Sequence, residues 1–165
     1  MKNSNRTYVF NNPIETGLRS LVILDSAYPK SLDLQKLIYF DYMTVHTGDL
    51  PSAPDSIHPS TPNRSGELLV RRKLIEDGIN YFVRKNFIDK IFNQNGIEYK
   101  LNDQATMFLD MLDEKYILNL QDRAKWVINI YQDWSSLELE EYIKENLDKW
   151  GGEFMYCNVE DISYG

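Results

Sequence analysis

The residue types best suited to acid-base or metal chemistry stand around a proline-rich stretch. His46 and Asp49 lie at its start and His58 lies inside it. Imidazole and carboxylate groups can share a divalent metal or move a proton, so these three residues could in principle serve a metal-dependent hydrolase. The chain has no HExxH, paired-cysteine or EF-hand spacing, and a histidine at a helix end commonly caps carbonyl groups or packs. We therefore predict no metal and no cofactor here.

A covalent nucleophile has equally little support. The single cysteine, Cys157, has no histidine close to it in sequence, and the chain has neither a GxSxG elbow nor a Gly-rich phosphate loop. Acidic pairs such as Glu140-Glu141 are typical of solvated helix faces, whereas a carboxylate dyad needs a cleft. We predict no catalytic residues and no enzyme.

One segment of this acidic chain is basic. The net charge is -7, but residues 64–86 hold six basic and three acidic side chains, a net +3. Cations on a helix could contact DNA phosphates; alternatively, acidic residues at helical spacing could pair with them and leave a mixed surface. Both readings stay open. The candidates for nucleic-acid contact are Arg71, Arg72, Lys73, Arg84 and Lys85.

Helices must position most of these residues. Asn12-Pro13 followed by Glu15 has the form of an N-cap, a first-turn proline and a capping-box acid, which predicts a helix that Tyr28-Pro29 ends. A second helix is expected from about Asp33 to His46. A third is expected from Ser65 to about Asn86, after a loop that contains four of the six prolines.

A β-hairpin follows the third helix. Two β-prone runs, Phe87–Phe92 and Ile97–Leu101, flank an Asn-Gln-Asn-Gly turn, and Asn-Gly is a strong hairpin signal. Helix, helix, loop, helix and hairpin is the order of a winged helix-turn-helix protein. We predict a mainly α fold with a small β-hairpin. Its parts are a winged helix-turn-helix core at 1–102 with the wing at 87–101, a C-terminal helical extension at 103–150 packed on it, and an extended tail at 151–165.

The aromatic content predicts a protein partner. Eleven tyrosines, seven phenylalanines and three tryptophans exceed what one small core readily hides. Tyr39, Phe40 and Met43 lie away from the main apolar stripe of their predicted helix, and interfaces favour such residues. Packing against the C-terminal helices is the alternative.

Membrane and secretion signals are not expected. The N-terminal residues are polar, and the apolar run Leu21–Leu24 is far shorter than the roughly 20 residues that cross a bilayer. A lone cysteine cannot form an internal disulfide. We predict a cytoplasmic protein.

Seven sequence blocks carry a family resemblance. They are FNNPIETGLR at 10–19, AYP at 27–29, LDLQKL at 32–37, DY at 41–42, VHTGD at 45–49, IHP at 57–59 and RSGELLVRR at 64–72. Together they resemble the middle component of bacterial ABC-three-component systems, in particular the small subunit of Lamassu-type antiphage defence complexes. Beyond residue 86 only the pattern is similar.

This resemblance implies a winged-helix adaptor that joins an SMC-like ABC ATPase dimer to an effector such as a nuclease, with DNA contacted mainly through the complex and no membrane association. It brings no catalytic residues. Our hypothesis is that its shared residues fix the loop or dock the ATPase. The predicted partner-binding residues are Leu34, Gln35, Tyr39, Phe40, Met43, His46, Asp49, His58 and Arg64. The alternative function is a winged-helix transcriptional regulator that binds DNA.

Overall fold

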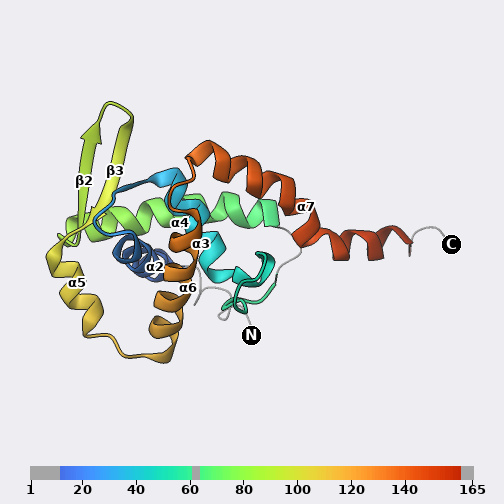
Figure 1. The fold of residues 1–165 in the computed structure, drawn as a ribbon, viewed down its shortest axis with the longest axis horizontal. Coiled ribbons are helices and arrows are strands. Elements are labelled where there is room, and N and C mark those ends of the chain that lie inside the picture. The colour runs from blue at the N-terminus through green and yellow to red at the C-terminus, as the bar shows by residue number, and fades with distance from the viewer. Residues whose placement is uncertain (1–11, 61–63, 161–165) are drawn as a thin grey trace, which may run out of the picture.

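Helices make up most of the fold, and a small antiparallel sheet stands at one end (Figure 1). The computed structural model describes residues 12–60 and 64–160, apart from the side chains of 64, 65, 148 and 151–160. The elements are α2 (Pro13–Ala27), β1 (Leu32–Asp33), α3 (Leu34–Val45), the 3-10 turn η1 (Thr47–Asp49), α4 (Arg64–Arg84), β2 (Ile88–Asn93), β3 (Gly96–Leu101), α5 (Asp103–Asp110), α6 (Lys115–Tyr131) and α7 (Ser136–Glu160). The predicted fold class is confirmed, and the order from α2 to β3 is compatible with a winged helix.

Side-chain caps explain where several helices begin. The Asn12 side chain accepts a hydrogen bond from the Glu15 amide at 2.9 Å, and the Asp33 side chain accepts one from the Lys36 amide at 2.7 Å. Ser135 and Glu138 exchange side-chain and backbone hydrogen bonds, which is a capping box. Each cap satisfies amide groups that have no partner inside the helix.

The predicted hairpin is present, with a third strand beside it. The strand order is β1-β3-β2, and Asn93 pairs with Gly96 across a turn formed by Gln94 and Asn95. Gly96 has a φ of 119°, a conformation that glycine adopts without a Cβ clash. β1 is two residues long and pairs with β3 through Leu32 and Tyr99. The sequence does not indicate this strand, because two residues are too few to show alternation.

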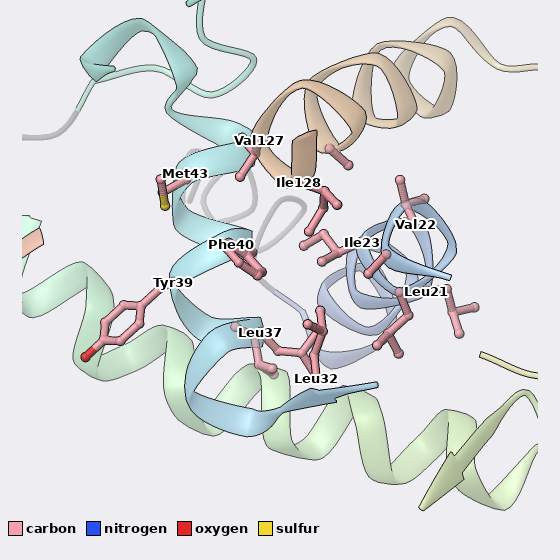
Figure 2. Packing of buried hydrophobic residues seen from close by; sticks show 14 of the residues in the cluster. Leu21, Val22, Ile23, Leu32, Leu37, Tyr39, Phe40, Met43, Val127 and Ile128 are labelled. Atoms are coloured by element: carbon pink, nitrogen blue, oxygen red, sulfur yellow. The ribbon is translucent and has the colours of Figure 1, made fainter. Parts of the chain in front are cut away.

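The core lies where α2, α3 and α6 meet. Figure 2 shows Ile23, Phe40 and Ile128, one from each helix, close together, and all three are buried. α2 also crosses α4 at very short range: a Cβ on Gly78 would lie 2.4 Å from the Pro13 carbonyl oxygen. Glycine is therefore required at this crossing. α6 contacts α2 and α3, whereas α7 contacts α3 and α4.

The predicted extended tail at 151–165 is wrong for residues 151–160. α7 continues through Gly151 and Gly152 to Glu160 and projects away from the body of the molecule (Figure 1). A glycine inside a helix costs only about 1 kcal/mol, so a helix that has already formed can continue through two of them. Residues 161–165 lie outside the described part of the chain.

Candidate functional site

Oppositely charged side chains meet between α2, α3 and α4. Asp41 of α3 is completely buried and accepts hydrogen bonds from Arg19 of α2 and Arg71 of α4. Arg19 approaches with Nε 2.8 Å from Oδ1 and Nη2 3.3 Å from Oδ2, and Arg71 Nη1 donates to Oδ2. One carboxylate thus joins three helices.

Arg71 extends these contacts to the end of α3. Its Nη2 donates to Glu67 Oε1, four residues earlier on α4, and His46 Nε2 lies 2.7 Å from the same oxygen. His46 is the C-cap residue of α3. We call Arg19, Asp41, His46, Glu67 and Arg71 the buried charge network.

The electrostatics of the network favour ion pairs. Burial alone would raise the pKa of Asp41, but the guanidinium groups of Arg19 and Arg71 outweigh that effect and hold it below its usual value. Burial would likewise lower the pKa of Arg19, and the charge of Asp41 raises it instead. Buried charges are tolerated when they are paired and hydrogen-bonded in this way.

His58 lies beside the network and bonds to α6. Its Nε2 is 2.9 Å from the hydroxyl of Tyr116, and the two rings are stacked. Burial, together with the positive charges of Arg19 and Arg71, lowers the pKa of His58 to about 3. Burial also raises the pKa of Tyr116 to about 12. Both groups are therefore neutral at pH 7, and their hydrogen bond fixes the loop before α4 to α6.

The three residues considered for metal chemistry have separate partners. Asp49 accepts a hydrogen bond from the Tyr42 hydroxyl at 3.2 Å, His46 contacts Glu67, and His58 contacts Tyr116. Within the described residues no group of three or more His, Cys, Asp or Glu side chains could hold a metal ion.

In the same part of the chain, no helix is both long and apolar enough to cross a membrane.

The predicted partner-binding residues divide into buried and accessible ones. Phe40 points into the core, while Tyr39 and Met43 leave α3 on another side (Figure 2), where α4 and α7 pack. All three are buried within this chain, so the interpretation that they are spare is wrong, because helices distant in sequence cover them. His46 and His58 are buried as well. Leu34, Gln35 and Asp49 are half-buried, and the side chain of Arg64, the first residue of α4, is not described.

The predicted DNA-contacting cations also divide. Arg71 is 3% exposed and bonded to two carboxylates, so its predicted role in contacting DNA is contradicted: it points inward from α4. Arg72, Lys73, Arg84 and Lys85 are exposed. Lys73 pairs with Asp77 at 2.8 Å, as its helical spacing suggested.

A groove lies between α3, α4 and α7. Its volume is about 350 Å³. Its apolar lining is Ile38, Tyr39, Leu68, Leu69, Ile143 and Leu147, and its polar lining is Gln35, Arg72, Glu140 and Lys144. We call it the α3–α4–α7 groove. Gln35, Tyr39 and Arg72 were predicted separately from the sequence, but the groove was not, because its walls come from three helices that are far apart in the chain.

The comparison with known proteins found one family. The model described as "ABC-three component (ABC-3C) system Middle Component 2" matches residues 9–153, which include every element from α2 to β3 and extend into α7. No curated protein and no solved structure matches the chain.

Proposed function

This chain belongs to the family of middle component 2 proteins of ABC-three-component systems, and on that premise we propose that it is a non-catalytic adaptor. In this proposal it links an SMC-like ABC ATPase to an effector nuclease in a bacterial antiphage or antiplasmid defence complex of the Lamassu type. The complex works in the cytoplasm, and DNA is contacted mainly through the ATPase. The observation that carries the proposal is the family match along most of the chain.

The buried charge network supports a structural role for residues that could otherwise be read as catalytic. Arg19, Asp41, His46 and Arg71 all lie in the sequence blocks of the family resemblance, and each is at most 3% exposed. Arg19 and Arg71 bond to Asp41, and Glu67 joins Arg71 to His46, so the contacts extend across α2, α3 and α4. An arrangement of this kind fixes the relative positions of the helices. An adaptor needs such rigidity to keep its two binding surfaces in a constant relative orientation.

Exposed apolar side chains support the proposal that this chain binds other proteins. Large apolar side chains are exposed on several different elements: Leu69 and Val70 on α4, Phe92 on β2, Met107 on α5 and Leu137 on α7. Single exposed apolar residues are ordinary, but patches of them mark contact sites. Here the exposed Leu69 of α4 lines the α3–α4–α7 groove together with other, mostly apolar, side chains.

Co-purification tests the adaptor proposal. The chain is co-expressed with the ATPase and the effector encoded beside it, and the mixture is analysed by size-exclusion chromatography at micromolar concentration. We expect one stoichiometric complex, and neither nuclease nor ATPase activity from this chain alone. Separate elution of the three proteins would refute the adaptor function.

A DNA-binding regulator is the second candidate. The observation that favours it is the set of exposed cations on and just after α4, together with the winged-helix order of elements. Such a protein should bind duplex DNA with an affinity that falls as salt rises, and the double variant R72E/K73E should weaken binding. Absence of a duplex shift at low salt would exclude this function for the isolated chain.

A further inference from the structure

The α3–α4–α7 groove presents apolar side chains to solvent. Leu69, on its α4 wall, is 77% exposed, although it is a large aliphatic residue. Leu68 from α4, Leu147 from α7 and Tyr39 from α3 continue the apolar lining. Covering Leu69 would remove apolar surface from water, which is favourable in proportion to the area covered.

The polar lining of the groove includes one cation, Arg72, whose charge no carboxylate among the described side chains neutralises. Arg72 Nη1 donates to the side-chain oxygen of Gln35 at 3.2 Å, which is a neutral acceptor. Within the described residues Arg72 pairs with no carboxylate. The other cation, Lys144, already pairs with Glu140 at 2.6 Å. A ligand that covers the groove therefore meets one guanidinium with most of its donors available, and a carboxylate is the acceptor that matches such a group best.

We propose that this groove docks an amphipathic helix of a partner component, with aliphatic side chains over Leu68, Leu69 and Leu147 and a carboxylate on Arg72. This proposal rests on the adaptor function proposed above. A helix suits the site because three helices form it, and a fourth can pack its ridges between them while its backbone hydrogen bonds stay internal. A partner strand would need a sheet edge, and every residue that lines the groove lies on a helix.

Neighbouring residues on α4 supply matched controls. Val70 is 61% exposed but does not line the groove, so V70D is the control for L69D. Lys73 is exposed, bonded to Asp77 and outside the groove, so K73E is the control for R72E. All four side chains are exposed, so we expect each variant to keep the melting temperature of the wild type within a few degrees.

The experiment measures the affinity of each variant for the purified ATPase and effector under conditions in which the wild-type complex forms. L69D and R72E should weaken binding to one of the two components by tenfold or more, whereas V70D and K73E should change it by less than about threefold. Equal effects within each pair, or no effect of L69D and R72E, would overturn the groove proposal while leaving the adaptor function intact. Failure of the wild-type complex to form would refute the adaptor function itself.

A photo-crosslinker identifies the occupant. With p-benzoylphenylalanine at position 69, the crosslink should map to a helical segment of the ATPase or effector that contains an acidic residue. Replacing that acid with arginine should restore binding by the R72E variant. A crosslink to a second copy of this chain would overturn the proposal. So would a crosslink to duplex DNA, with R72E and K73E weakening DNA binding equally.

Discussion

The two sides of α4 use adjacent arginines in different ways. Arg71 points inward, is 3% exposed and bonds to the carboxylates of Asp41 and Glu67. Arg72, the next residue, points to the surface and meets a neutral amide at the groove. The charge of the inner arginine is paired with carboxylates of this chain, whereas the outer arginine has no carboxylate partner among the described residues. Burial decides this difference, since the two side chains have the same chemistry.

Burial also determines how much the ion pairs on the inner and outer sides of α4 contribute to stability. A buried ion pair loses much hydration, and removing one partner leaves the other charged and unpaired. An exposed ion pair is surrounded by water and salt, which already screen its charges. Substitutions inside the network should therefore affect stability, while substitutions on the outer side should affect binding.

The largest expected effect comes from Asp41→Asn. This change leaves the buried guanidinium groups of Arg19 and Arg71 without the carboxylate they share, and such a loss typically costs about 3 to 5 kcal/mol. The free energy of unfolding, measured by urea denaturation, should fall by that amount. The control is Asp133→Asn, which breaks the exposed Lys30 pair and should leave the unfolding midpoint almost unchanged. Similar losses from both changes would show that burial does not distinguish the two pairs.

The second effect is a loss of stability in mild acid that depends on His58. The folded pKa of His58 is about 3, whereas the unfolded chain titrates near 6.5. Between these values the unfolded state binds a proton that the folded state does not, so stability falls as pH is lowered through 6.5. This one group should lower the free energy of unfolding by about 2 kcal/mol between pH 7 and pH 5.

His58→Gln isolates that contribution. Glutamine retains a polar group that can bond to Tyr116 but has no titration in this range. Urea denaturation at a series of pH values should therefore give a flatter curve for the variant between pH 7 and pH 5. Parallel curves for the variant and the wild type would mean that His58 accepts a proton in the folded protein.

The smallest effect on stability is expected from Arg72→Ala. Its side chain is exposed and bonded only to Gln35 among the described residues, so the free energy of unfolding should change by less than about 0.5 kcal/mol. Arg71→Ala, one residue away, should cost several times more, because it leaves Asp41 with one guanidinium and removes a partner of Glu67. Thermal unfolding of the two variants measures this contrast, and equal losses would show that Arg72 is part of the folded core.

Local sequence determined where most elements begin. The caps at Asn12, Asp33 and Ser135 act within three residues of the helix start, and the hairpin turn lies between adjacent strands. Such features need no distant contact, so the predicted helices and hairpin are confirmed nearly to the residue. The helical spacing of Lys73 and Asp77 likewise allowed their ion pair, which was one of the two alternatives for the basic segment.

Tertiary structure decided which side of each helix is covered. Helical periodicity shows that Arg71 and Arg72 point in different directions, but not that Asp41, thirty residues earlier, neutralises one of them. It could not show that Tyr39 and Met43 are buried, nor that Leu69 and Leu147 line one groove. The physical reason is that burial and charge pairing depend on contacts between segments far apart in the chain, whereas caps and turns depend on neighbours in sequence.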